Sequence, residues 1–370
     1  MPVHADDRQS SASPAAKRIR FSATIQSRAM ASREPATVHV ADSMQFQSEI
    51  TATIAWRTQP WKASSMADKT KIEWAEASWN PFRGCTRVSP GCQNCYAERM
   101  AARGLPGYLS PTTGLPFASM TPSGPHWRNV VEVIEKQIEV PIHWRKPRRV
   151  FVNSMSDTFH ERFMHEQIAI VVDVAMLAPQ HSYLFLTKRA DRAREFWVRY
   201  YAAYADQELL AETLDDIAGR SHRAWPPTPF DNVWMGVSAE DQQRFDERIE
   251  DLRATPAAIR WLSLEPLLGP IDLAGRLDGI HWVVVGGESG PGARPCDVEW
   301  IRGIVRQCRE AGVAVFVKQL GRAVTGNPDE FPSAIHDDGD GHRTFRLNDG
   351  KGGDPAEWPT DLRVREVPNA

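Results

Sequence analysis

The 370-residue sequence lacks a long apolar run, a dispersed set of cysteines and a strong excess of charge. Its most apolar stretch, Ile168 to Ala178, is too short and too polar to span a bilayer. Its five cysteines do not form an even, dispersed framework, which favours a reducing compartment over a disulfide-bonded fold. There is no contiguous apolar segment near the start of the sequence, so a secretory signal is not expected. We therefore expect a soluble, cytoplasmic protein with no membrane partner.

The formal net charge is also small, at −3, which argues against a generally basic nucleic-acid-binding surface and leaves room for a local basic groove. A candidate for such a groove is Arg145–Arg149 with His143 and Trp144. The alternative is a solvated segment leading into a strand, which we favour.

Composition divides the chain into three parts. Residues 1–65 are rich in Ser, Ala, Thr and Gln and show no periodicity, which predicts a disordered N-terminal extension. A transit peptide is a minor alternative, and Met66 is a possible true start. Residues 66–321 alternate between strand and helix patterns and form the predicted barrel domain. Residues 322–370 turn to Gly, Asp and Pro, which predicts a loop-rich C-terminal tail.

The alternation of strands and helices predicts an α/β fold. Repeated strand–helix units with nearly continuous apolar strands are typical of parallel strands with helices outside. Six or seven units indicate a partial or complete (β/α) barrel, and a doubly wound open sheet is the alternative. The predicted strands are Arg149–Asp157, Ser182–Lys188, Asn232–Glu240, Ile259–Glu265, His281–Glu288 and Val313–Lys318. The predicted helices include Glu161–Leu177, Gln242–Arg253 and Val298–Ala311.

Polar side chains stand where the predicted strands end, and in barrels the chemistry lies at these carboxyl ends. Glu265 and Glu288 are catalytic candidates, because a carboxylate that ends an apolar strand is costly unless it is paired. Lys188, itself a catalytic candidate, is a plausible partner, as are Arg189 and Lys318. The other polar residues at strand ends include Asn153, Ser154, Ser156, Asp157, Ser238, Glu240 and Ser263.

Three cysteines gather in one short stretch, Cys85, Cys92 and Cys95, with the spacing C-x6-C-x2-C. Thiolates select zinc, copper(I) or iron–sulfur clusters. A structural zinc site would need a fourth ligand, such as a histidine, Cys296 or Cys308. No second C-x2-C or H-x3-H follows in the sequence, which favours a cluster with one open iron over zinc.

From Met66 to about Arg322 the sequence resembles a radical S-adenosylmethionine-like protein family of unknown function that is common in phages and prophages. The motifs that carry the resemblance are Trp79-Asn-Pro-Phe-Arg-Gly-Cys85, Ser89-Pro-Gly-Cys-Gln-Asn-Cys-Tyr-Ala-Glu98, Asn153-Ser-Met-Ser-Asp157, Leu186-Thr-Lys-Arg189, Gly236-Val-Ser-Ala-Glu240, Leu264-Glu-Pro-Leu-Leu-Gly-Pro270 and Gly286-Gly-Glu-Ser-Gly-Pro-Gly-Ala-Arg-Pro295. Lys351–Pro359 also belongs to this set.

The resemblance implies a [4Fe–4S] cluster held by Cys85, Cys92 and Cys95, with S-adenosylmethionine on the open iron. Reductive cleavage would give a 5′-deoxyadenosyl radical and would need an electron donor. The substrate is unknown, with a nucleic acid or nucleotide the best guess. The implied cofactor-binding residues are Asn153, Ser154, Ser156 and Asp157 near the methionine amino group, and Ser238 and Glu240 near the ribose.

Each of these assignments has a structural alternative, since Asn153–Asp157 and Glu240 could equally begin the helices that follow. The chain also departs from the superfamily in two ways. The first cysteine gap is six residues rather than three, and Asn94 stands where an aromatic residue is usual, with Tyr96 on the far side. The alternative function is a non-enzymatic, zinc-binding phage protein associated with nucleic acid.

Overall fold

The computed structural model describes residues 70, 72–105, 107–218, 229–331, 335–336 and 344–368. The chain divides into two compact units, Met1–Thr51 and Ala52–Ala370, and all of the described residues belong to the second. The predicted N-terminal extension, residues 1–65, lies outside the described residues.

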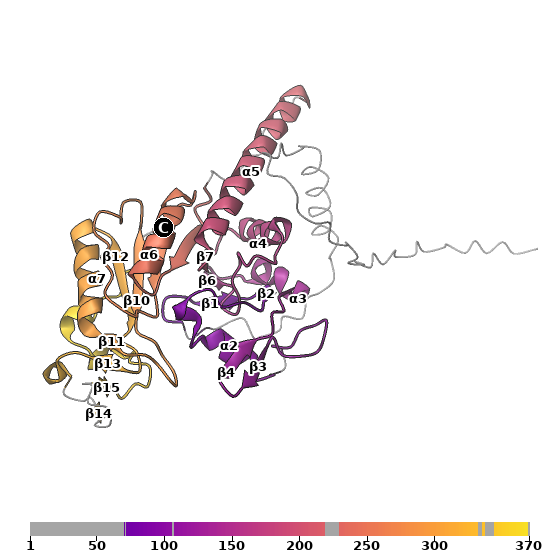
Figure 1. Ribbon diagram of the computed structural model, residues 1–370. Coiled ribbons are helices and arrows are strands. Elements are labelled where there is room, and N and C mark those ends of the chain that lie inside the picture. Colours follow the sequence, from indigo (N-terminus) through magenta and orange to yellow (C-terminus); the bar gives the residue numbers. More distant parts are fainter. Residues whose placement is uncertain are drawn as a thin grey trace, which may run out of the picture. The chain divides into compact units, whose positions relative to one another are not determined.

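Seven parallel strands form one curled sheet, and their order in the sheet follows their order in the chain (Figure 1). A doubly wound sheet would reverse its winding direction part-way, and this sheet does not. The predicted partial (β/α) barrel is therefore confirmed. In sheet order the strands are β1 (Ala77–Trp79), β6 (Arg149–Val152), β7 (Ser182–Thr187), β8 (Val233–Ser238), β9 (Ile259–Leu264), β10 (Trp282–Gly286) and β12 (Ala314–Gln319).

Helices pack on the outside of this half-barrel (Figure 1). They are α4 (His165–Leu177), α5 (Ala190–Ala218), α6 (Gln242–Ala254) and α7 (Val298–Ala311). The Asp241 side chain accepts a hydrogen bond from the Arg244 N–H and so begins α6, as an N-cap does. Gly312, at φ 69°, ends α7 in the left-handed conformation that favours glycine. Within the described residues, no helix is long and apolar enough to cross a membrane.

The strands separate two cores because successive side chains point to opposite faces of a sheet. Val283 and Val285 belong to the core beneath the helices, whereas Trp282 and Val284 belong to the core inside the half-barrel. Four tryptophans dominate the inner core, with ring centroids 5.2–6.1 Å apart in the contacting pairs. They are Trp74, Trp234, Trp261 and Trp282. These tryptophans fill the interior below the carboxyl ends of the strands.

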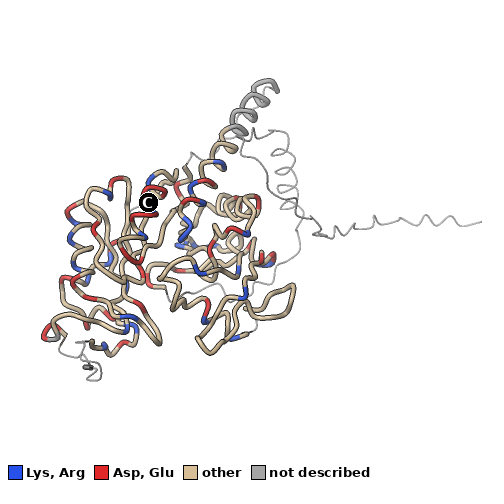
Figure 2. The backbone as a smooth tube through the Cα atoms, in the orientation of Figure 1, with Lys and Arg blue, Asp and Glu red and all other residues tan. Residues whose placement is uncertain are grey.

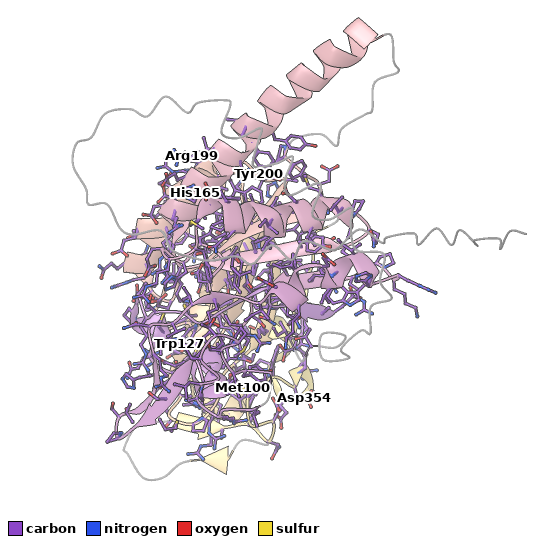
Figure 3. The ribbon with its side chains drawn as sticks, turned by 90° about the vertical axis from the view of Figure 1, so that its right-hand side faces the viewer. Met100, Trp127, His165, Arg199, Tyr200 and Asp354 are labelled. Atoms are coloured by element: carbon purple, nitrogen blue, oxygen red, sulfur yellow. The ribbon has the colours of Figure 1, made fainter. Side chains whose placement is uncertain are left out.

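The long connection from β1 to β6 folds into small elements beside the barrel. Helix α2 packs on the hairpin of β3 and β4, where Met100 and Trp127 are labelled in Figure 3. These elements are β2 (Phe82–Arg83), α2 (Tyr96–Ala101), β3 (Ala118–Thr121), β4 (Gly124–Trp127), β5 (Glu132–Val133) and α3 (Glu135–Ile138), with the 3-10 helices η2 (Pro90–Cys92) and η3 (Val140–His143).

The C-terminal part of the chain builds a second, four-stranded sheet and also covers the edge of β12. The Val317 N–H donates to the Val364 carbonyl at 2.8 Å, and the Glu366 N–H donates to the Val315 carbonyl at 3.0 Å. The elements are β11 (Cys296–Asp297), β13 (Val324–Thr325), β14 (Ile335–His336), β15 (Thr344–Arg346), η4 (Pro328–Glu330), η5 (Pro355–Glu357) and η6 (Thr360–Leu362).

Candidate functional site

Residues 84–95, here called the cysteine loop, leave the barrel after β1 and β2 and carry the three clustered cysteines. Gly84 opens the loop at φ 87°, and a side chain there would meet the Val130 carbonyl oxygen at 1.9 Å. Gly84 also forms a parallel bridge with Ser156, in the segment that follows β6. The start of the loop is therefore fixed against the exit of the neighbouring strand.

The three cysteines of the loop are free and partly exposed. Burial raises the pKa of Cys85 to about 12, and the negative charge of Asp157 raises it further. Burial also raises the pKa of Cys95. The charges of Cys95 and Cys92 raise the pKa of the Cys85 thiol slightly further.

The other two cysteines lie elsewhere. Cys296 and Cys308 are buried in the core beneath the helices, and burial raises the pKa of both thiols. The charge of Asp297 raises the pKa of Cys296 further, and the charge of Glu366 raises that of Cys308. Only the cysteines of the loop thus form a group of thiols in the described part of the chain.

One side of the loop is held at Thr86 by residues that follow β6 and β7. The Arg189 guanidinium donates to Thr86 Oγ1 at 2.8 Å, and His160 Nε2 lies 3.0 Å from the same oxygen. Burial, and then the charge of Arg189, lowers the pKa of His160 to about 4, so its ring is neutral at pH 7. His160 Nδ1 accepts from the Arg162 N–H, which leaves the proton on Nε2 to donate to Thr86. Both ring nitrogens are therefore occupied.

The middle of the loop is held by Glu240, which follows β8. The Gly91 N–H donates to Glu240 Oε1 at 2.8 Å, and a side chain at residue 91 would come within 2.9 Å of this carboxylate. Glu240 is fully buried and its other oxygen pairs with Arg248 on α6 at 3.2 Å. Burial by itself would raise the pKa of Glu240, but the charge of Lys188 and the hydrogen bonds from Ser89 and Gly91 lower it below its usual value. The carboxylate is charged and serves as an anchor.

The far side of the loop is held by Glu288, which follows β10. Asn94 donates its amide to Glu288 Oε2 at 2.9 Å and to the Gly292 carbonyl at 2.8 Å. Arg294 pairs with Glu288 at 2.6 Å and also donates to the Pro90 carbonyl at 3.0 Å. Against the effect of burial, these bonds lower the pKa of Glu288. An aromatic residue at position 94 could not make the two amide bonds, which gives Asn94 a structural role.

The segment after β6 is an internally bonded turn. Asn153, at φ 57°, accepts from the Phe82 N–H through its side-chain oxygen and donates to Thr158. Asp157 accepts from Thr187 Oγ1 at 2.7 Å and pairs with Arg189 at 2.9 Å.

Two serines complete this turn. Ser154 Oγ bonds to Asn80, and the carbonyl of Ser154 accepts from the Tyr96 hydroxyl at 2.6 Å. Ser156 is different, since its buried hydroxyl oxygen has no hydrogen-bond partner in the described residues. Within this segment, Ser156 Oγ is the group left for a ligand.

A third group of polar residues links β7, β8, β9 and β12. The Lys188 ammonium donates to Ser238 Oγ at 2.7 Å, and Ser238 Oγ donates to the Glu265 carbonyl at 3.3 Å. Lys318 pairs with the Glu265 carboxylate at 2.6 Å, and Gln319 donates to it at 3.2 Å. The predicted pairing of Glu265 with Lys318 is thus present, whereas Lys188 bonds to a hydroxyl.

A family model described as Protein of unknown function (DUF5131) matches residues 69–351. The chain belongs to this family. No curated protein and no solved structure matches it. The matched span of this DUF5131 chain contains the whole parallel sheet and the cysteine loop. The family description names no activity.

Cys85, Cys92 and Cys95 of the DUF5131 chain are spaced as a possible cluster motif. Three free thiols stand on one loop, whereas Cys296 and Cys308 belong to the core and His160 has both nitrogens occupied. In the part of the chain that the structure describes, no three His, Cys, Asp or Glu side chains already converge on one point as a metal site. The ligand assignment therefore rests on the donor set and on the anchoring of the loop.

Several residues that hold the loop are not evident from local sequence patterns. Arg248, Arg294 and His160 act on residues that are distant in sequence, and Tyr96 reaches across to the turn after β6. The only local signal was the polar residue at position 94, where the resemblance implied an aromatic residue.

Proposed function

We propose that this DUF5131 chain is a radical S-adenosylmethionine-type iron–sulfur enzyme. The observation that carries the proposal is the position of three free thiols on a loop anchored over the carboxyl end of a parallel half-barrel. In barrels of parallel strands, chemistry belongs to this end. Cys85, Cys92 and Cys95 would hold a [4Fe–4S] cluster with one open iron. The motifs quoted from the sequence support the same assignment.

When bound, the cluster and S-adenosylmethionine supply reductive cleavage to a 5′-deoxyadenosyl radical, which abstracts hydrogen from a substrate. An electron donor must reduce the cluster. The protein contributes orientation and exclusion of water. Glu240 and Glu288 hold the loop, and Asn153, Ser154 and Asp157 shape the turn beside it.

Two groups of residues are left for ligands. Ser156 offers a hydroxyl group for direct contact with the cofactor, whereas the Ser238 hydroxyl is bonded to Lys188. Lys188 and Glu265 are the groups that could act on the substrate, because they lie partly exposed among the strand ends. A nucleotide or nucleic acid is the proposed substrate class.

Anaerobic reconstitution of the full chain with iron and sulfide tests the cluster. We expect a brown protein with about four iron and four sulfide per chain. Cys85→Ser, Cys92→Ser and Cys95→Ser should each lose most of this iron. Cys296→Ser is the matched control, because its thiol lies in the core, and it should retain the cluster. Iron loss in the control equal to that in the loop variants would refute the ligand assignment.

Zinc analysis of the same preparations tests the alternative. One tightly bound zinc per chain with no iron uptake would overturn the proposal in favour of a zinc-binding protein. If the cluster forms, 5′-deoxyadenosine produced from S-adenosylmethionine under reduction is the expected sign of catalysis, and its absence would refute the enzymatic part.

A further inference from the structure

We propose that Lys188, together with Ser238, binds a phosphate group of the substrate. This inference rests on the proposed function and deepens it, because it names the chemical class that the site would recognise.

Four other cations at this end form ion pairs. Arg189 pairs with Asp157, Arg248 with Glu240, Arg294 with Glu288 and Lys318 with Glu265, at nitrogen–oxygen distances of 2.6–3.2 Å. Among the described residues, Lys188 makes no ion pair with a carboxylate. Its ammonium group donates a hydrogen bond to the neutral hydroxyl of Ser238, at 2.7 Å. An ammonium group carries three N–H donors, so two remain for a ligand.

The position of Lys188 makes this incomplete pairing informative. Its side chain is partly buried between the strand ends, where a charge without a partner is unfavourable. The same ammonium interacts electrostatically with Cys95 and with Glu240, which anchors the loop. A group bound at Lys188 would thus lie beside the proposed cluster ligands, where the hydrogen to be abstracted must also lie.

The strand register places further polar groups next to this lysine. Ser238 pairs with Ser263 on β9, and one layer deeper Gly236 pairs with Trp261. The indole N–H of Trp261 is fully buried and has no hydrogen-bond partner in the described residues. The absence of a side chain at residue 236 makes room for this ring, since a Cβ would meet Trp261 Nε1 at 2.4 Å. Within the described part of the chain, Trp74 and Trp234 have unpaired indole nitrogens in the same core, so the polar group that this register places beside Ser238 is the Ser263 hydroxyl.

The chemistry of the donors favours phosphate over a planar carboxylate. An arginine fork binds a carboxylate with two parallel bonds, and here Arg294 binds Glu288 in this way. Arg189 and Arg248 already pair with Asp157 and Glu240. Lysine binds phosphate as a point charge, and a hydroxyl group can add a bond to the same anion.

The distribution of charge favours a small phosphorylated substrate. Figure 2 shows Lys and Arg interspersed with Asp and Glu along the described chain, and the net charge of the sequence is −3 rather than strongly positive. The phosphate of a nucleotide therefore fits this site better than a long nucleic acid.

Phosphate binding to the full chain tests the inference, measured by calorimetry at constant ionic strength with inorganic phosphate as the probe. We expect Lys188→Met to weaken phosphate binding by about tenfold or more, as loss of a charged hydrogen bond does. Lys188→Arg should retain part of the affinity. Lys136→Met, which removes an exposed lysine on α3, is the control for net charge and should bind as wild type. Circular dichroism verifies that each variant is folded.

The measurement is made before and after cluster reconstitution, so that the two proposals fail separately. Phosphate binding that depends on Lys188 in a chain without iron uptake would support this inference and refute the proposed function. Iron uptake together with equal phosphate affinity in wild type and Lys188→Met would support the proposed function and refute this inference. If Lys188→Met weakens only the binding of S-adenosylmethionine, the anion held by Lys188 is the carboxylate of the cofactor, and the inference is wrong. A change confined to the reduction potential of the cluster would also overturn it.

Discussion

Replacing Glu240 with alanine should destabilise the protein even when no cofactor is bound. The carboxylate is fully buried, accepts the Gly91 N–H at 2.8 Å and pairs with the buried Arg248 at 3.2 Å. Truncation leaves the guanidinium buried with the Ser238 carbonyl as its remaining acceptor. Removing one partner of a buried ion pair costs about 3–5 kcal/mol. For a domain of this size we expect the unfolding midpoint to fall by about 6 °C or more.

The assay is guanidinium and thermal unfolding of the apoprotein, followed by iron reconstitution. Glu247→Ala is the matched control, because Glu247 is an exposed residue of α6 at 3.8 Å from Arg244 and should contribute at most about 1 kcal/mol. The double variant Glu240→Ala/Arg248→Met should be less destabilised than the sum of its single variants. Released from its anchor, the loop of Glu240→Ala should also take up less iron than that of Glu247→Ala.

One result would refute this reasoning. If the apoprotein of Glu240→Ala is within about 1 kcal/mol of wild type, the carboxylate does not hold the loop. If Glu240→Ala then changes only the binding of S-adenosylmethionine, Glu240 binds the cofactor, as the resemblance implies.

Two further predictions concern the framework. Burial raises the pKa of Asp173 on α4 to about 6, although a hydrogen bond from the Tyr200 hydroxyl on α5 acts to lower it. Figure 3 labels Tyr200. The folded state therefore binds the proton more tightly than the unfolded state, and stability falls as pH rises from about 4 to 6. Asp173→Asn should be more stable than wild type by about 1–3 kcal/mol at pH 8, with the gap closing below pH 4 in urea titrations; an unchanged gap would contradict the assigned cause. Gly236→Ala places a Cβ 2.3 Å from the Trp261 ring and should lose about 1–3 kcal/mol, whereas Gly303→Ala on α7, with open space, should gain up to about 1 kcal/mol; equal unfolding midpoints would disprove the clash.

The strands were predictable because parallel strands are buried on both faces and have nearly continuous apolar sequences. The predicted strand at Ser182–Lys188 differs by one residue from β7, and the predicted helix Val298–Ala311 coincides with α7. The polar residue that ends each run marks the carboxyl end of the sheet. Local sequence thus predicts both the fold and the end at which the site lies.

Other features depend on contacts that sequence patterns do not reveal. Residues 200–230 have the composition of an insertion, yet α5 continues to Ala218. Glu240 and Glu288 stand out as polar residues at strand ends, but their partners in the cysteine loop, Gly91 and Asn94, lie 149 and 194 residues away. The sequence therefore identifies these carboxylates without separating a ligand-binding role from an anchoring role.

The anchoring of the cysteine loop also determines when during synthesis the loop can become ordered. Its cysteines leave the ribosome early, but its carboxylate anchors follow β8 and β10, and Arg294 comes later still. Contacts this distant in sequence form late in folding because the intervening chain must first be fixed. A nascent chain that ends before Glu288 would therefore present thiols on an unsecured loop. If the proposed cluster forms, its loading with iron should be a post-translational step that requires the completed barrel.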